Sequence, residues 1–174
     1  MTQPLHTIRQ LAYVVRDLDA ALKYWVDVLK VGPFFLFEHC PLLDQKYLGK
    51  PGNADVSLAL GNSGDLQIEL IYQHNDAPSV YKEFLDAGRV GVHHFGLMPV
   101  DYAATCEQYR KLGHAAAFEC TVGGAALTYF DTVSMLGHYT ELWDNSNVFK
   151  DLFFMVENAA KGWDGQNAIR KGPL

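Results

Sequence analysis

Residues 92–100 read Val-His-His-Phe-Gly-Leu-Met-Pro-Val, and this stretch repeats the opening segment of the chain. Ile8-Arg-Gln-Leu-Ala-Tyr-Val-Val15 matches it at an offset of 84 residues, so that Gln10 is equivalent to His94. Both segments contain the β-branched and aromatic residues that favour strands. Asp17 and its equivalent Asp101 come next, and Asp is a preferred N-cap of a helix. We therefore predict two related halves, each beginning with a strand and then a helix.

Three further strands are predicted in each half, over residues 34–37, 56–60 and 66–72 in the first and 116–121, 126–130 and 138–143 in the second. Thr140-Glu-Leu142 corresponds to Ile68-Glu-Leu70 at an offset of 72 residues. The two offsets differ by 12 residues, which predicts an insertion in the polar stretch around residues 41–53. Because one β-α-β-β-β unit is too small to be stable alone, we expect an α+β fold. In this fold two such modules pair and form a mixed sheet that lines a cleft.

The repeat also predicts the organisation of the chain. We expect one domain over residues 1–144, made of modules at about 7–75 and 91–144 that are linked by a helix over 78–87. A length of 174 residues agrees with a single structural unit. The remaining residues, 145–174, lie outside the repeat. We expect this tail to begin with an amphipathic helix that covers a sheet or a subunit, and to end irregularly.

The composition excludes several classes of protein. Hydrophobic residues make up 49% of the chain and charged residues 20%, which is typical of a globular protein and not of a disordered one. The net charge is −6 and the 14 Lys and Arg residues are scattered, so nucleic acid is not an expected partner. No apolar run is long enough to span a membrane, and the first residues do not resemble a signal peptide. With three cysteines that form no paired motif, the sequence predicts a cytoplasmic protein that acts on a small molecule.

Two glutamates occupy equivalent positions in the two halves. Glu69 and Glu141 each interrupt a run of apolar residues in a predicted strand. A carboxylate buried among apolar residues is costly unless it is paired or binds a metal. Together with Gln10 and His94, these residues form a candidate divalent-metal site of one imidazole, two carboxylates and one amide oxygen. A single glutamate in a strand more often faces solvent, and this alternative stays open for each residue taken alone.

The chain resembles the vicinal oxygen chelate superfamily in three segments: Gln10-Leu-Ala-Tyr-Val-Val-Arg-Asp17, Gly91-Val-His-His-Phe-Gly96 and Thr140-Glu-Leu-Trp-Asp144. This superfamily includes glyoxalase I, methylmalonyl-CoA epimerase, extradiol dioxygenases and bleomycin-binding proteins. The resemblance implies that one divalent ion (Zn, Ni, Co or Mn) is bound by the first and last strands of each module, through Gln10, Glu69, His94 and Glu141. His93 is expected to point the other way along its strand.

The resemblance also implies an activity. A metal ion that binds a carbonyl oxygen stabilises the enolate formed when a proton leaves the adjacent carbon, so we expect a lyase, isomerase or epimerase reaction. Glu141 is the candidate base, with Glu69 as the alternative. A non-catalytic binding or resistance protein of the same fold is the second hypothesis. An iron-dependent dioxygenase is the third, and the presence of only one imidazole disfavours it because such iron sites use two.

Two departures from the named enzymes bear on the substrate. In glyoxalase I an Arg that holds glutathione stands four residues after the first ligand, whereas this chain has Val14 there. The epimerase uses a Glu from the third strand of its first module, and the corresponding stretch here is Gly52-Asn-Ala-Asp55. Neither glutathione nor methylmalonyl-CoA is therefore the expected substrate.

A cleft lined by aromatic residues is expected to bind a hydrophobic, oxygenated small molecule. The same aromatic residues also suit an ordinary sheet core, and that alternative stays open. We further expect a homodimer. The candidate substrate-binding residues are Tyr13, Phe37, Tyr47, Phe95, Tyr129 and His138.

Overall fold

The computed structural model describes residues 6–173. The first half of the repeat consists of β1 (Ile8–Val14), α1 (Leu18–Asp27), β2 (Phe34–Phe37), β5 (Val56–Ser63) and β6 (Leu66–Gln73). The second half consists of β7 (His94–Leu97), α3 (Tyr102–Lys111), β8 (Ala116–Val122), β9 (Ala125–Phe130) and β10 (Tyr139–Trp143). The other elements are β3 (Leu43–Tyr47), β4 (Lys50–Pro51), α2 (Val80–Asp86), α4 (Val133–Leu136), α5 (Asn147–Ala160) and β11 (Ile169–Lys171). Within residues 6–173, no helix combines the length and hydrophobicity that are needed to cross a bilayer.

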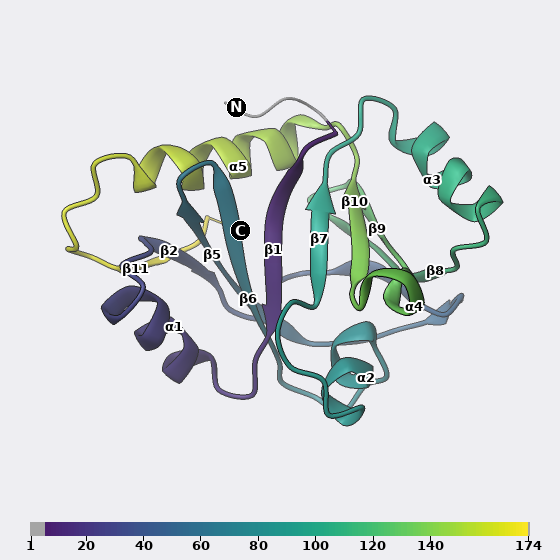
Figure 1. The fold of residues 1–174 in the computed structure, drawn as a ribbon, viewed down its shortest axis with the longest axis horizontal. Helices are drawn as coiled ribbons and strands as arrows, with labels where there is room; N and C mark the ends of the chain where they lie inside the picture. Colours follow the sequence, from purple (N-terminus) through teal and green to yellow (C-terminus); the bar gives the residue numbers. More distant parts are fainter. Residues whose placement is uncertain (1–5, 174) are drawn as a thin grey trace.

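The strands of the described residues form one mixed sheet, in the order β11-β2-β5-β6-β1-β7-β10-β9-β8-β3-β4. Each half contributes four neighbouring strands, and the halves join where β1 pairs antiparallel with β7. The sheet is curved, with β1 and β7 in its middle and α1 and α3 on either side (Figure 1). The predicted α+β fold of paired β-α-β-β-β modules is confirmed.

The repeated aspartates begin the two equivalent helices. Asp17 accepts a hydrogen bond from the Ala20 N–H at 2.9 Å, and Asp101 accepts one from the Ala104 N–H, also at 2.9 Å. Both aspartates have extended backbones, as N-cap residues do. A cap of this kind contributes about 1 kcal/mol of stability. The chain therefore turns from strand into helix at the same place in each half.

The insertion of the first half extends the sheet of the second half. β3 lies in the polar stretch around residues 41–53 and pairs antiparallel with β8, and β4 pairs with β3. The sequence predicted only a polar insertion here. The side chains of β3 are mostly exposed on both faces, so the segment lacks the alternation that identifies a strand. Its strand conformation comes from its distant partner β8.

The tail also returns to the sheet. α5 packs against β5 and β6 and buries Phe149, Phe153 and Val156. β11 then pairs in parallel with β2 and becomes the outermost strand of the first half. The prediction of an irregular end was wrong for these three residues, because so short a strand shows no readable period. The second half of the sheet is thus extended by β3 and β4, which lie in the first half of the sequence. The first half of the sheet is extended by β11, which follows the second half in the sequence.

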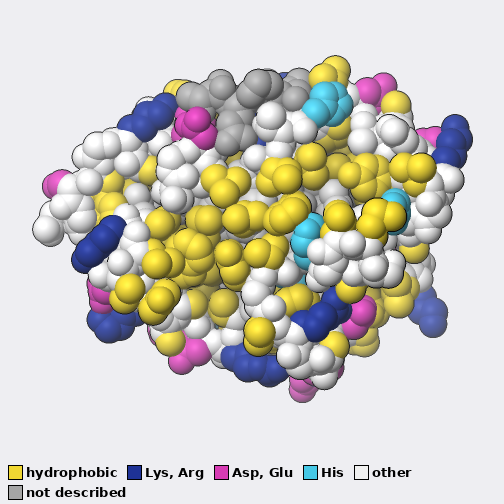
Figure 2. All heavy atoms as spheres, in the orientation of Figure 1, with side chains coloured by type: hydrophobic (Ala, Val, Ile, Leu, Met, Phe, Trp, Pro, Cys, Tyr) yellow, Lys and Arg dark blue, Asp and Glu magenta, His cyan; other side chains and the backbone are white. Residues whose placement is uncertain are grey.

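Hydrophobic side chains gather on the outer face, over the middle of the sheet (Figure 2). Leu11 on β1 pairs with Phe95 on β7, and Tyr13 and Leu97 follow on the same face. These four side chains are partly exposed. The opposite, inner face of the same strands carries the polar residues described next.

Candidate metal centre

Strand register brings the four candidate ligands together on the inner face of the sheet. They come from the neighbouring strands β6, β1, β7 and β10. Each is paired with a small residue of an adjacent strand, and paired residues face the same side of a sheet. The pairs are Ala12 with Glu69 and with His94, and Gly96 with Gln10 and with Glu141.

One imidazole nitrogen stands among three oxygens. His94 Nε2 lies 3.1 Å from Gln10 Oε1, 3.3 Å from Glu69 Oε2 and 3.1 Å from Glu141 Oε2. All four residues are buried, and a single Nε2 proton cannot satisfy three acceptors. Within residues 6–173, Glu69 Oε2 has no hydrogen-bond partner.

These separations fit a shared cation. Ligands bonded at about 2.1 Å stand about 3.0 Å apart around an octahedral ion and about 3.4 Å apart around a tetrahedral one. The observed 3.1–3.3 Å lies between these two values. Glu69, His94 and Glu141 each offer a ligand atom at this point, and Gln10 adds an amide oxygen. The residues present therefore fit a divalent metal ion.

His93 sets the direction in which His94 offers its lone pair. His93 Nε2 lies 3.2 Å from the Val80 carbonyl oxygen, which can only accept, so this nitrogen carries the proton. His93 Nδ1 is then an acceptor for the Nδ1–H of His94 at 2.9 Å. The lone pair of a neutral His94 consequently lies on Nε2, facing Gln10 and the two glutamates. His93 precedes β7, and its ring packs against Tyr129 and Tyr139 on the side of the sheet that carries Glu141, so the prediction that it points the other way is not confirmed.

Burial and charge shift the pKa values of these groups. Burial alone would lower the pKa of His94, but Glu141 and Glu69 outweigh it and raise this pKa to about 9. Burial raises the pKa of Glu69, an effect that His94 only partly opposes. Burial also lowers the pKa of His93 well below its usual value, so His93 is neutral. A divalent cation bound in place of the Nε2 proton of His94 would balance the charge of the two carboxylates.

A small, mostly apolar cavity of about 50 Å³ adjoins the candidate ligands. Gln10, Glu69 and Glu141 line it, as do two of the predicted substrate-binding residues, Phe37 and Tyr129. The Tyr129 ring stands edge-on to His94, 4.8 Å between ring centres. The helix α5 covers the cavity with Phe149, Leu152 and Phe153.

The other four predicted substrate-binding residues lie elsewhere. Tyr13 packs on Trp25 of α1 on the outer face. The rings of Phe95 and His138 contact each other at 3.8 Å between ring centres with a tilt of 50°, and neither residue lines the cavity. Tyr47 donates a hydrogen bond to Glu83 at 2.8 Å, away from the centre. Tyr13 and Phe95 stand an odd number of residues from Gln10 and His94, and this difference places them on opposite faces of the strands.

Sequence reasoning missed several residues of the site. Gln67 accepts a hydrogen bond from Gln10 Nε2 at 2.8 Å, which turns Gln10 Oε1 toward His94. The signal for Gln67 was its position two residues before Glu69, on the same face. The residues of α5 that cover the cavity could not be predicted in this way, because the sequence of a helix does not indicate which part of a sheet it packs on.

Gly96 makes room for a ring beside the ligands. A Cβ atom at this position would stand 1.9 Å from the ring of Trp143, which lines the cavity. Only glycine lets the strand β7 pass under that ring. Packing against Trp143 therefore explains the glycine at the end of the motif Gly91-Val-His-His-Phe-Gly96.

Paired modules with nitrogen and oxygen donors converging on the shared inner face define a vicinal-oxygen-chelate type of protein. The family model described as Glyoxalase/Bleomycin resistance protein/Dioxygenase superfamily matches residues 9–130. The chain belongs to this superfamily, and the predicted resemblance is confirmed. No curated protein matches the sequence significantly.

Solved structures with the same fold are distant in sequence. A hypothetical protein, BH1468 from Bacillus halodurans C-125, is 17% identical with a TM-score of 0.58, over 81% of this chain and 95% of that one. Methylmalonyl-CoA epimerase from Mycobacterium tuberculosis is 18% identical with a TM-score of 0.57, over 87% of this chain and 95% of its own. A Streptomyces coelicolor methylmalonyl-CoA epimerase variant is 18% identical with a TM-score of 0.52, over 83% and 98%. At these identities the likeness shows the fold alone.

Proposed function

We propose that this chain is a metal-dependent enzyme that moves a proton at a carbon next to a carbonyl group of a small oxygenated molecule. The reaction would be of the lyase, isomerase or epimerase type. The convergence of Gln10, Glu69 and Glu141 on Nε2 of His94 carries this proposal. A divalent ion bound there supplies positive charge that stabilises a developing oxyanion. The mixed nitrogen and oxygen donors suit Zn, Ni, Co or Mn, and suit Fe less because only one imidazole is present.

The two carboxylates are the groups proposed to move the proton. Glu69 and Glu141 occupy equivalent positions in the two halves, and both line the cavity. We assign the role of base to Glu141, with Glu69 as the alternative, because a base must reach the carbon from which it takes the proton. Both are also candidate metal ligands, so the base would have to loosen from the ion to accept the proton.

Tyr129 is proposed to bind a substrate oxygen. Its hydroxyl accepts a hydrogen bond from the Tyr81 hydroxyl at 3.1 Å, which leaves the Tyr129 O–H to donate. Burial raises the pKa of Tyr129 well above its ordinary value, so this donor keeps its proton. Its position in the wall of the cavity supports the assignment.

The size of the cavity limits what can enter. About 50 Å³ is far below the roughly 300–1,000 Å³ of typical ligand pockets. With α5 in this position, only the oxygenated, reacting end of a substrate fits. The remaining, hydrophobic part of such a substrate would have to displace side chains of α5 from the apolar wall of the cavity. A homodimer and a cytoplasmic location stay predictions.

Hydrogen–deuterium exchange tests the proposed chemistry. The full chain, loaded with Zn²⁺, Ni²⁺, Co²⁺ or Mn²⁺, is incubated in deuterated water with pyruvate, 2-oxobutyrate or dihydroxyacetone. We expect deuterium to appear at the carbon next to the carbonyl, as followed by proton NMR. Removing the metal with a chelator should stop the exchange, and Glu141→Gln should slow it at least 100-fold, which is the lower range for loss of a catalytic base.

Matched variants separate the possible outcomes. Glu107→Gln changes an exposed carboxylate of α3 and should leave the exchange unchanged. If Glu69→Gln abolishes the exchange and Glu141→Gln does not, the base is Glu69. Metal-dependent binding of these compounds without exchange under any metal would contradict the enzyme proposal, and would favour the alternative of a small-molecule binding protein.

A further inference from the structure

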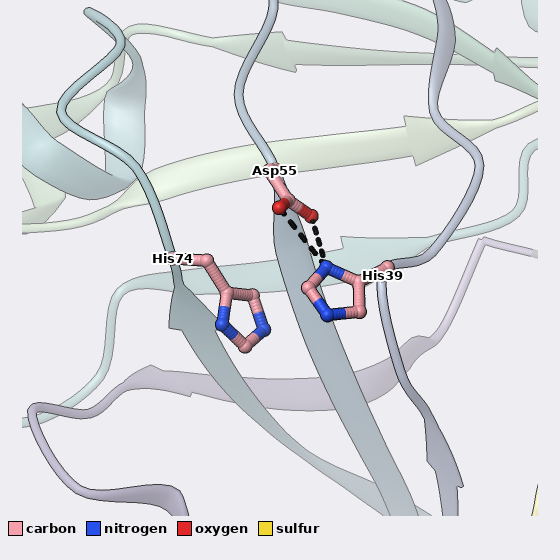
Figure 3. Close-up of side chains that lie close together, drawn as sticks. All are labelled: His39, Asp55 and His74. Atoms are coloured by element: carbon pink, nitrogen blue, oxygen red, sulfur yellow. Dashed lines mark hydrogen bonds and ion pairs between the residues drawn. The ribbon is translucent and has the colours of Figure 1, made fainter.

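Three more ligand-type side chains meet at one end of the first half of the sheet. His39 follows β2, Asp55 precedes β5 and His74 follows β6, so three separate segments supply them (Figure 3). One possible ligand atom from each lies within 4.8 Å of the other two. We propose that this surface triad, His39, Asp55 and His74, is a second binding site for a first-row divalent transition metal ion such as Zn²⁺.

The donor set carries this inference. Two imidazoles and one carboxylate are a common ligand set for zinc and other first-row ions. Asp55 accepts from His39 Nδ1 at 2.8 and 3.0 Å, and this bond leaves the lone pair of His39 on Nε2. Within residues 6–173, no lysine or arginine forms an ion pair with Asp55. The carboxylate charge is therefore available to a cation.

Closing around an ion requires the His39 and His74 rings to turn, because they stack at 4.3 Å between ring centres with 26° between their planes. Ligands of a tetrahedral ion stand about 3.4 Å apart, so the three ligand atoms must approach by at most about 1.4 Å. The side chains are 65% exposed for His39 and 39% exposed for Asp55. Side chains with this much freedom can rotate over such a distance without any movement of the backbone.

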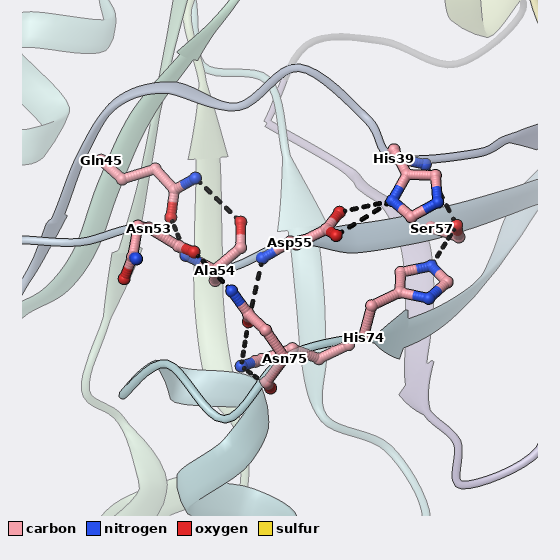
Figure 4. Close-up of polar contacts among 9 residues, drawn as sticks. His39, Gln45, Asn53, Ala54, Asp55, Ser57, His74 and Asn75 are labelled. Atoms are coloured by element: carbon pink, nitrogen blue, oxygen red, sulfur yellow. Dashed lines mark hydrogen bonds and ion pairs between the residues drawn. The ribbon is translucent and has the colours of Figure 1, made fainter.

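A hydrogen-bond network holds the backbone of the triad in place (Figure 4). The Asn75 side chain accepts from the Asp55 N–H at 3.2 Å. The Ser57 hydroxyl oxygen accepts from the His39 N–H at 3.2 Å and lies 2.7 Å from His74 Nε2. His39 has a φ of 49°, in the left-handed region that a histidine seldom adopts. These hydrogen bonds fix the backbone from which the three donors extend.

A nucleophilic site is a poorer interpretation of the same residues. In a serine triad one histidine contacts both the serine and the acid. Here Ser57 bonds His74, whereas Asp55 bonds His39, so no single imidazole links the two. Ser57 is also only 3% exposed, and its hydroxyl oxygen already accepts from the His39 N–H.

The surface triad is separate from the inner metal centre and open to solvent. Glu69 and His74 are five residues apart, which is about 16 Å along an extended strand. A groove of about 330 Å³ lies beside the triad, with Ser57, Tyr72 and His74 in its wall. The coordination positions that the protein leaves free would therefore reach water or a small ligand in this groove.

Counting bound metal tests the second site. In equilibrium dialysis of the full chain against Zn²⁺, the wild-type protein should bind one ion more per chain than His74→Ala or His39→Ala. Both side chains are exposed, so the variants should fold normally. His114→Ala is the control, because His114 is a half-buried histidine outside both clusters, and this variant should bind as many ions as the wild type. In histidine-ring NMR, Zn²⁺ should shift the His39 and His74 signals and leave those of His114.

This test of the second site does not depend on whether the inner centre, formed by Gln10, Glu69, His94 and Glu141, binds a metal ion. His94→Ala removes the imidazole ligand of that centre. In this background, His74→Ala should still lower the number of bound Zn²⁺ ions by one per chain. If the inner centre binds no metal, His94→Ala has no effect on the count, whereas His74→Ala still removes one ion. Equal zinc counts in the wild type, His39→Ala and His74→Ala would overturn the second site.

Discussion

Nε2 of His94 faces the candidate metal centre because a neighbouring residue holds the other side of its ring. The chain from His94 Nδ1 to His93 and on to the Val80 carbonyl leaves His94 Nε2 as the lone-pair nitrogen when His94 is neutral. Gln67 acts in the same way on Gln10. Each of these two residues hydrogen-bonds a candidate ligand and thereby orients its donor atom toward the centre.

Replacing His93 by phenylalanine should weaken metal binding at the inner centre and keep the fold. The new ring still packs beside Tyr81 and Phe84, but it offers no acceptor to the His94 Nδ1–H. We expect the affinity for Zn²⁺ to fall by about 10–100-fold, measured in competition with a chelator of known affinity.

The control for this variant is His138→Phe. His138 is also buried, but its ring contacts Phe95 and does not line the cavity, so its replacement should leave the zinc affinity unchanged. Circular dichroism verifies that both variants are folded. An unchanged affinity in His93→Phe would show that this hydrogen bond does not prepare His94 for the ion.

Among the elements, α5 has the most direct effect on the cavity. Its neighbouring residues Phe153 and Phe154 face opposite environments, since Phe153 is 3% exposed and Phe154 is 52% exposed. Phe153 touches the ring of Trp143 and lies under the guanidinium of Arg9. The helix therefore contacts the central strand β1 through this buried ring and through the buried ion pair of Arg9 with Glu157 at 3.9 Å.

Truncating these two rings should have very different effects on stability. Phe153→Ala removes buried contacts and leaves a void, and we expect the free energy of unfolding to fall by about 3–5 kcal/mol. Phe154→Ala removes an exposed ring and should change it by less than about 0.5 kcal/mol. Urea unfolding followed by tryptophan fluorescence measures both values. Equal losses in the two variants would mean that α5 does not pack on the sheet as described.

Local signals account for the parts of the fold and the site that the sequence predicted. Asp17 and Asp101 mark helix starts by themselves, and the repeat aligned His94 with Gln10 before any contact was known. Other features depend on partners far away in the chain. β3 and β11 are strands only because β8 and β2 offer edges, and the cover of the cavity depends on where α5 docks. Tyr13 was assigned to the cleft by its residue type, whereas its position in the strand places it on the outer face.

At the scale of the whole molecule, the two halves are joined by more than the pairing of β1 with β7. β3 leaves the first half and extends the second, while α5 and β11 leave the second half and return to the first. The candidate ligands are shared in the same way, with Gln10 and Glu69 from the first half and the other two from the second. Neither half is therefore complete without the other.

This exchange of segments predicts that the protein can be rebuilt from two pieces but not from one. A cut after Val90, in the exposed connection between α2 and β7, gives fragments 1–90 and 91–174. Each fragment would expose an unpaired sheet edge and apolar surface, so we expect it to be unfolded or aggregated alone. Mixing should restore a one-to-one complex with the circular dichroism of the intact chain. Separate folding of either fragment would contradict the interdependence of the two halves.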